Sequence, residues 1–348
     1  MLKSDTKQLP AASNSRFALT FIALAIVLFV SALVTLSIGH YSYNPLDVLR
    51  VISDAIQGNE QADPSMGLVL VNIRLPRLIA ALIVGSALSI SGAVYQGVFR
   101  NPLVSPDILG VSNGACVGAA IAIVFGFSFV AQQVFAFVIG MVAVGIAILI
   151  PRIVRHKGNI ILVLSGIIVS GFFSSIMALM KFTAKEDTDL AEIVYWQMGT
   201  LARISYKDLA VVVPVVIICL VILLLLAWRL NILSFGEVEA KTLGMNTTRL
   251  RGVVIICASC LTASTVCISG TIGWIGLIIP HLSRLMVGSD HRKQLPITIM
   301  LGAVFLLIID TMCRTLTTQD IPISVLTGLV GAPFYAWLLW KQKSANLL

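Results

Sequence analysis

The sequence predicts an all-α membrane protein that crosses the bilayer about ten times. Hydrophobic residues make up 58% of its 348 residues, charged residues make up only 11%, and the mean hydropathy is +0.98. A soluble globular chain has about 45–50% apolar and about 25% charged residues. Because roughly half of a folded surface in water is polar, so few polar residues could not cover a soluble protein of this length. Much of the chain must therefore face lipid.

The few charges are clustered, which leaves long runs without Asp, Glu, Lys or Arg. These runs are 17–38, 78–99, 108–151, 158–180, 209–228, 252–283, 294–309 and 321–340. A helix needs about 20 apolar residues to cross the hydrocarbon, so most runs hold one span. The 108–151 run holds two, with a break near 126–133, and 252–283 holds one span and the start of another. We therefore expect ten spans.

These spans are expected to be helices, since lipid satisfies no backbone polar group and only helices or closed barrels can cross it. Barrel strands would alternate polar and apolar residues, and these runs do not. The first run resembles a signal peptide in its position. Its 22 residues exceed the apolar core of a signal peptide, about 7–15 residues, so we expect an uncleaved first span.

The distribution of Lys and Arg predicts the orientation of the spans. Cytoplasmic loops are enriched in these residues. With a cytoplasmic amino terminus and ten spans, sixteen of the 24 Lys and Arg residues fall on the inner side and eight on the outer side. We expect both termini to be cytoplasmic, with tails 1–16 and 341–348. The net charge of +8 follows from this orientation and does not require a nucleic-acid partner.

No catalytic residue, metal site or cofactor site is expected in this chain. The sequence has no G-x-x-x-x-G-K-[ST] loop for ATP and no H-E-x-x-H zinc motif. Cys257 and Cys260 have C-x-x-C spacing but lack a second pair of ligands. Asp310 is the clear ionisable residue inside an expected span, whereas ion-coupled carriers and membrane enzymes keep several. Another subunit is therefore expected to supply the energy.

Three stretches carry motifs that are more specific than hydropathy. They are Arg74-Leu-Pro-Arg77 with Arg100-Asn-Pro-Leu103 and Pro106-Asp-Ile-Leu-Gly110; Gly270-Thr-Ile-Gly-Trp-Ile-Gly276 with Pro280-His-Leu-Ser-Arg284; and Asp310-Thr-Met-Cys-Arg314 with Gly331-Ala-Pro-Phe334. In this order, over residues 72–339, they resemble the FecCD-type permeases of ATP-driven importers for iron-siderophores, haem and cobalamin. Two positions depart from the family pattern: Ser324 replaces a glycine and Thr200 replaces a serine.

The resemblance implies a single transmembrane permease domain over residues 1–348 in the bacterial cytoplasmic (inner) membrane. It implies a homodimer, two ATPase subunits that bind ATP and Mg, and a periplasmic or lipid-anchored binding protein. The implied cargo is a metal chelate, ferric siderophore first and then haem or cobalamin. An oxyanion such as molybdate stays open, and an ion-coupled secondary transporter is a weaker alternative.

The resemblance also assigns docking of the binding protein to Arg74, Arg77 and Arg314, placed before the second span and at the end of a later one. Arginine suits this role because its planar fork holds a carboxylate with two hydrogen bonds. Two alternatives are interfacial anchoring of the arginines and, for Arg314, an ion pair with Asp310 four residues earlier.

Two cytoplasmic sites follow from the same resemblance. The first is an ATPase-coupling segment over 233–250, expected as two short helices broken by Gly244, or alternatively a plain solvated loop. Its assigned residues are Gly236, Glu237, Ala240, Leu243 and Gly244. The second is a cytoplasmic gate made of Asn101, Leu103, Asn159 and Ile160, for which helix capping by asparagine is the alternative.

Overall fold

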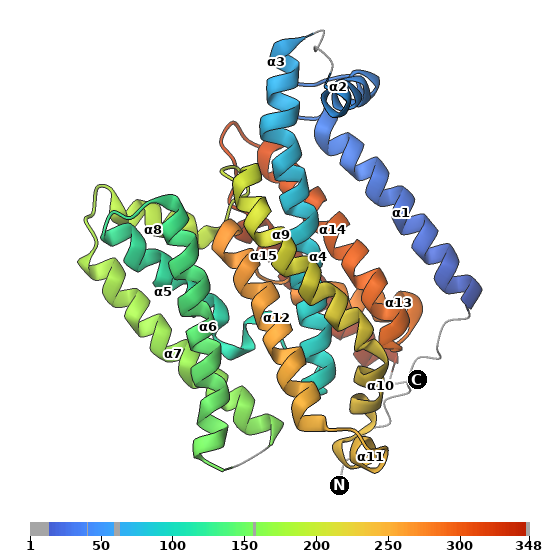
Figure 1. The fold of residues 1–348 in the computed structure, drawn as a ribbon. Helices are drawn as coiled ribbons and strands as arrows, with labels where there is room; N and C mark the ends of the chain where they lie inside the picture. Colours follow the sequence, from blue (N-terminus) through green and yellow to red (C-terminus); the bar gives the residue numbers. More distant parts are fainter. Residues whose placement is uncertain (1–13, 40, 59–62, 156–157, 346–348) are drawn as a thin grey trace.

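The computed structural model describes residues 14–39, 41–58, 63–155 and 158–345, and every regular element in these ranges is a helix (Figure 1). The predicted all-α fold is confirmed for them. The elements are α1 (Asn14–Ser37), α2 (Pro45–Gln57), α3 (Pro64–Gly67), the π-helical η1 (Leu68–Arg74), α4 (Leu75–Phe99), the 3-10 helix η2 (Pro106–Leu109), α5 (Val111–Val124), α6 (Phe129–Ile153), α7 (Asn159–Thr183), α8 (Asp189–Met198), α9 (Tyr206–Leu225), α10 (Ala227–Phe235), α11 (Glu237–Thr242), α12 (Thr247–Ser269), α13 (Ile275–Val287), α14 (His291–Thr315) and α15 (Ile323–Ala345).

Seven helices in the described ranges are long and apolar enough to cross a membrane: α1, the continuous α3–α4 helix, α6, α7, α9, α12 and α14. Three shorter apolar helices, α5, α13 and α15, occupy the remaining predicted runs. The predicted break in the 108–151 run is confirmed at residues 125–128, between α5 and α6. The chain is therefore a multi-pass membrane protein. The count of ten crossings and the cytoplasmic side of both termini stay predictions.

The second predicted span is longer than expected. It starts at Pro64, where the Asp63 side chain accepts hydrogen bonds from the Ser65 and Met66 backbone N–H groups, and runs 36 residues to Phe99. At 1.5 Å per residue this helix is about 54 Å long, well beyond the ~30 Å hydrocarbon core. Arg74 and Arg77, expected just before the second span, lie inside this continuous helix, which gives them a rigid support. Their position relative to the membrane stays a prediction.

The predicted tails also differ from the structure. Residues 14–16 form the first turn of α1, and residues 341–345 continue α15. The rest of both predicted tails, 1–13 and 346–348, lies outside the described residues. The helix boundaries extend past the charge-free runs because charged side chains at a helix end can reach the interface while their backbone stays helical.

The core is built around α4 and α12, whose most apolar windows are 83% and 78% buried, whereas the window of α1 is only 6% buried. Small residues bring the helices of this core close together. A Cβ atom on Gly92 would lie 1.9 Å from the carbonyl oxygen of Gly276 in α13, and one on Gly85 would lie 2.2 Å from that of Gly302 in α14. Helices pack by close backbone approach of this kind in lipid, because lipid is as apolar as their side chains and the hydrophobic effect does not drive them together.

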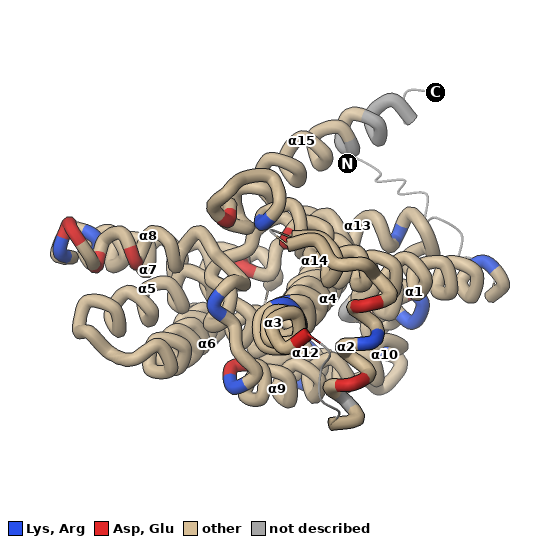
Figure 2. The backbone as a smooth tube through the Cα atoms, turned by 90° about the horizontal axis from the view of Figure 1, so that it is seen from above, with Lys and Arg blue, Asp and Glu red and all other residues tan. Residues whose placement is uncertain are grey.

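The molecule has two ends, the α2 end and the α11 end. The α2 end holds α2, α3 and the start of α9, and the α11 end holds α11 and the last turns of α4 and α6 (Figure 1). Under the predicted orientation the α11 end is cytoplasmic. Seen from above, α15 extends away from the other helices (Figure 2).

Candidate transport sites

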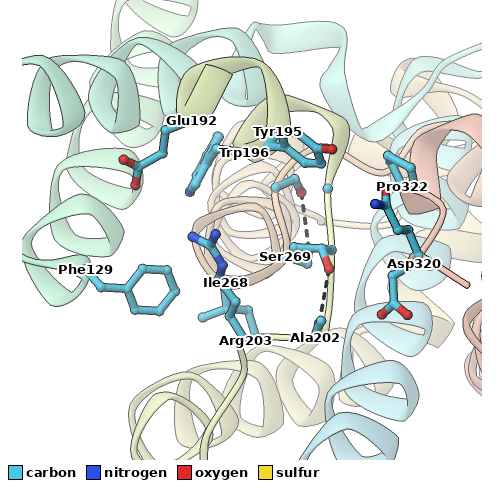
Figure 3. A pocket seen from close by; sticks show the side chains of 14 residues that line it. Phe129, Glu192, Tyr195, Trp196, Ala202, Arg203, Ile268, Ser269, Asp320 and Pro322 are labelled. Atoms are coloured by element: carbon cyan, nitrogen blue, oxygen red, sulfur yellow. Dashed lines mark hydrogen bonds between the residues drawn. The ribbon is translucent and has the colours of Figure 1, made fainter. Parts of the chain in front are cut away.

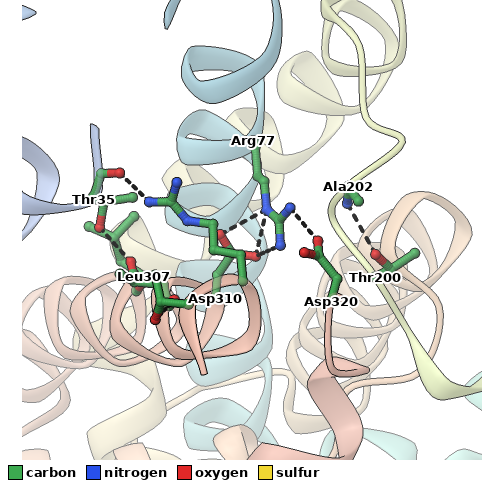
Figure 4. Close-up of polar contacts among 10 residues, drawn as sticks. Thr35, Arg77, Thr200, Ala202, Leu307, Asp310 and Asp320 are labelled. Atoms are coloured by element: carbon green, nitrogen blue, oxygen red, sulfur yellow. Dashed lines mark hydrogen bonds and ion pairs between the residues drawn. The ribbon is translucent and has the colours of Figure 1, made fainter. Parts of the chain in front are cut away.

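Arg77 forms the centre of an ion-pair network at the α2 end (Figure 4). Its Nε donates to both carboxylate oxygens of Asp310, at 2.9 and 3.0 Å, and its Nη1 donates to Asp320 Oδ2 at 2.6 Å. The side chain of Asp310 is 1% exposed and that of Arg77 is 12% exposed. The network therefore joins α4, α14 and the segment that leads into α15.

Arg74 and Arg314 instead hold the end of α1. Arg74 donates to the backbone carbonyls of Leu36 and Tyr41, and Arg314 donates to the carbonyl of Thr35. The last carbonyls of a helix lack intrahelical partners and carry partial negative charge, which suits a guanidinium. Both arginine residues are 7% exposed. Among the described residues, neither has a carboxylate partner.

One alternative for Arg314 is wrong. The predicted ion pair between Asp310 and Arg314 does not form, because Asp310 faces Arg77 from α4 instead. Interfacial snorkelling does not describe Arg74 or Arg314 either, since both side chains are turned into the protein. The three arginines and the two carboxylates together carry one surplus positive charge. Their role in docking stays a prediction.

A pocket of about 260 Å³ lies beside this network at the α2 end (Figure 3). It is lined by the start of α6, α8 and the turn after it, the end of α12 and the segment before α15: Phe129, Glu192, Tyr195, Trp196, Gly199, Thr200, Ala202, Arg203, Ile268, Ser269, Gly270, Gln319, Asp320 and Pro322. Asp320 belongs to both the pocket and the Arg77 network. Arg203 lines this pocket together with the aromatic pair Tyr195 and Trp196.

The predicted coupling segment is helical, but its break lies elsewhere. The two short helices are α10 and α11, and they are separated at Gly236, whose φ of +154° and ψ of 157° are tolerated essentially by glycine alone. Gly244 ends α11 with a φ of +75°. Ala240 is buried and Leu243 is 67% exposed. The side chain of Glu237 lies outside the described part of the structure.

The predicted gate residues lie near the ends of α4 and α7. Asn159, the first residue of α7, donates from Nδ2 to the carbonyl of Val98 at 3.3 Å, and so satisfies the end of α4. Asn101 accepts from the backbone N–H of Leu103 at 2.9 Å. Leu103 is 58% and Ile160 is 81% exposed. Asn159 does not cap its own helix, whose N-cap is Gly158, and a gate made of the exposed Leu103 and Ile160 stays a prediction.

The described residues contain no group of three or more His, Cys, Asp or Glu side chains that could hold a metal ion. Residues 110–114 do have the G-x-S-x-G spacing of a nucleophile elbow. An elbow places its serine on a turn between a strand and a helix, with a histidine base. Ser112 instead lies in the first turn of α5 and donates to Asp107. This spacing therefore does not indicate a hydrolase.

Comparison with known proteins places the chain in a family. A model described as the FecCD transport family matches residues 24–341. The molybdate import system permease MolB of Haemophilus influenzae is 39% identical, over 93% of this chain and 96% of its own length. An iron chelatin transport system permease of Helicobacter pylori is 38% identical, over 94% and 97%. The hemin permease HmuU of Yersinia pestis is 35% identical, over 82% and 87%.

Solved structures agree with this assignment. One that is described as an inward-facing conformation of a metal-chelate type ABC transporter superposes with a TM-score of 0.84 at 40% identity, over 92% of this chain and 98% of that one. PsaBC from Streptococcus pneumoniae gives a TM-score of 0.55 at 17% identity, over 83% and 94%, which shows a shared fold alone. The helical architecture and a family match that spans most of its length show that the chain belongs to the FecCD transport family of ABC importer permeases.

Proposed function

We propose that this permease works in the bacterial cytoplasmic membrane and imports a metal chelate, ferric siderophore first and then haem or cobalamin. An extracytoplasmic binding protein delivers the cargo, and two partner ATPase subunits that bind ATP and Mg drive the transport. The family match over residues 24–341 carries this proposal. The apolar helical wall agrees with it, since a conduit of this kind needs no catalytic group of its own.

The oxyanion alternative keeps some support. The molybdate and iron chelatin permeases are almost equally similar to this chain, at 39% and 38% identity. A pocket of about 240 Å³ between α5, α7 and α8 is lined by Asn113, Cys116, Ser174, Met177, Ala178, Lys181 and Gln197. Lys181 donates to Gln197 Oε1 at 2.7 Å. A cation in an otherwise neutral pocket suits negatively charged cargo, which includes anionic chelates as well as oxyanions.

An ion-coupled carrier fits less well. Such a protein needs ionisable groups in its spans that can bind and release the coupling ion. Asp310 lies in the spanning helix α14, directly after the charge-free run 294–309, and it is held by Arg77 at 2.9 Å. This pairing favours a structural role for the carboxylate.

Uptake by the assembled importer tests the cargo. The permease, its ATPase and its binding protein would be reconstituted in vesicles and offered ferric siderophore, haem, cobalamin or molybdate separately. We expect ATP-dependent accumulation of one of the chelates. Accumulation of molybdate alone would replace the chelate assignment, and accumulation of none of the four would contradict it.

A second copy of the chain is proposed as the partner of α15 and α7. Helix α15 extends away from the rest of the molecule in Figure 2, and its Leu329 and Trp337 are 67% and 49% exposed. On α7, Ile167 and Phe172 are 58% and 60% exposed. These apolar faces support a homodimer with the pathway between the two copies.

For docking, Arg74 and Arg314 are the stronger candidates by charge, because they bind neutral carbonyl groups whereas Arg77 already holds two carboxylates. We expect the Arg74→Ala/Arg314→Ala double variant to bind the binding protein roughly 30-fold more weakly, as about 2 kcal/mol is lost with a buried charged contact. Arg50→Ala is the matched control. Its side chain lies at the same end and is 78% exposed, and among the described residues it pairs with Asp47 alone, at 3.6 Å. Binding of the folded double variant with wild-type affinity would exclude this docking role.

For coupling, the Gly244→Val variant is expected to hydrolyse ATP while its cargo uptake falls at least tenfold. Gly244 needs a positive φ that a β-branched residue adopts only with strain of roughly 1–2 kcal/mol, although no atom would obstruct the new side chain. Gly252→Val on α12 is the control, because its Cβ also meets nothing within 4 Å and its φ is ordinary. Equal uptake per ATP hydrolysed in both variants would rule out a coupling role for the α11 turn.

A further inference from the structure

A basic cavity of about 640 Å³ lies at the α11 end, between α9–α10 and the start of α12. Its lining residues are Leu226, Trp228, Arg229, Ile232, Leu243, Gly244, Met245, Asn246, Arg249, Leu250 and Val253. Two of them are arginines and none is acidic. Arg229 and Arg249 are both exposed, and neither has an ion-pair partner within the described ranges. The cavity is therefore electropositive and open to a ligand.

The cavity lies where two apolar spans end. Arg229 follows the last residue of α9 by four positions, and Arg249 is the third residue of α12. Both α9 and α12 are of membrane-crossing length. Trp228, beside Arg229, is 58% exposed, and tryptophan is enriched at the level of lipid headgroups. The two guanidinium groups are thus placed at the height of the phosphates of the adjoining leaflet.

The surface next to the cavity on the membrane side is apolar. Leu225 at the end of α9 is 77% exposed, and Val253 and Ile256 on α12 are 43% and 52% exposed. Val253 itself lines the cavity. When the charged headgroup of a ligand lies in the cavity, its acyl chain can therefore contact the apolar surface of α9 and α12.

The start of α12 adds to the attraction for an anion. Asn246 caps this 23-residue helix by accepting the backbone N–H of Arg249 at 2.9 Å. The amino end of a helix carries partial positive charge within its first turn. Since this end lines the same cavity as both arginines, the helix dipole and the two guanidinium groups attract an anion into the same cavity.

We propose that this cavity binds the phosphate headgroup of an anionic phospholipid, with Arg229 and Arg249 as the phosphate ligands. Arginine holds phosphate through paired hydrogen bonds, and basic pockets between transmembrane helices suit anionic headgroups. An acidic segment of the ATPase is the competing occupant, because Leu243 and Gly244 also belong to the predicted coupling segment. The lipid is favoured because the cavity continues into the apolar, exposed surface of α9 and α12.

Native mass spectrometry of the delipidated full chain, with and without its ATPase, tests the proposal. Phosphatidylglycerol and phosphatidylcholine with identical acyl chains would be titrated, with glycerol phosphate as the free-headgroup probe. We expect phosphatidylglycerol to bind selectively, and Arg229→Gln/Arg249→Gln to weaken it about 30-fold, the loss for two arginine contacts at a membrane surface. Arg152→Gln/Arg155→Gln is the matched control, since it removes two exposed arginines from the same end, outside the cavity.

Several results would overturn the proposal. An equal loss of phosphatidylglycerol binding in the control variant would mean that the lipid is attracted by the positive charge of this end in general and not by the cavity. Full binding by the Arg229/Arg249 variant would place the lipid elsewhere. Glycerol phosphate binding as tightly as the lipid would exclude the acyl-chain surface, and release of the lipid when the ATPase is added would assign the cavity to that subunit.

Discussion

Replacing Asp310 with asparagine is expected to destabilise the purified permease by about 3–5 kcal/mol, because Arg77 then stays buried without its buried counter-charge. Asp310 is 1% exposed and lies 2.9 Å from the guanidinium of Arg77. The measurement is the melting temperature of the detergent-solubilised chain. Asp320→Asn is the control, since Asp320 touches the same arginine but is 31% exposed. We expect that change to destabilise the protein by about 1 kcal/mol, in the range of an exposed ion pair.

A second comparison separates the loss of charge balance from a loss of packing. The Arg77→Met/Asp310→Leu double variant removes both charges together and keeps apolar volume. Replacing a buried pair with apolar residues is often neutral or stabilising, so this variant should melt well above Asp310→Asn. A double variant that is no more stable than Asp310→Asn, or an Asp310→Asn protein with wild-type stability, would contradict the structural role of the network.

This network also changes how a docking experiment should be designed. Charge reversal at Arg77 would bring a third carboxylate beside Asp310 and Asp320, so a loss of transport could follow from misfolding. Arg74 and Arg314 are better positions, because their partners are neutral carbonyl groups.

Gly92→Leu is expected to reduce the yield of monodisperse permease at least tenfold. A Cβ atom at this position would lie 1.9 Å from the backbone oxygen of Gly276, and α13 cannot move aside easily because Gly276 is itself packed against Pro106. Forcing side chains into a filled core costs typically 1–3 kcal/mol for smaller insertions than this one. Size-exclusion chromatography after mild solubilisation measures the effect.

Gly145→Leu on α6 is the control for this substitution. Gly145 also lies within an apolar spanning helix, but a Cβ atom added to it would meet no neighbouring heavy atom within 4 Å. We expect a normal yield from it. If Gly92→Leu and Gly145→Leu were recovered in equal amounts, the close contact between α4 and α13 would not be needed for folding.

The helices themselves were predictable because lipid imposes length and composition on each span. The break at 125–128 and the start of α7 at Asn159 follow directly from where apolar residues stop and polar or glycine residues begin. The short helices were harder. Gly236 and Gly244 are both helix terminators in the sequence, and only the structure shows that the break between α10 and α11 falls at Gly236.

The partners of the arginines could not be predicted from local sequence. Arg77 lies 233 positions from Asp310 and 243 from Asp320, and the helical spacing of Asp310 and Arg314 suggested a different pair. The electropositive cavity likewise combines Arg229 and Arg249 from two different helices. Such contacts depend on which spans lie next to each other. The apolar pattern of the sequence locates each span but does not show which spans are adjacent.

The central claim is that this chain is a passive wall whose transport is powered by a separate ATPase. It is tested most directly by comparing cargo uptake into vesicles that contain the purified chain alone with uptake into vesicles that also contain its ATPase and Mg-ATP, with the binding protein present in both. We expect accumulation only in the second preparation, and none when ATP is replaced by a non-hydrolysable analogue. Accumulation by the chain alone, with or without an ion gradient, would contradict the claim.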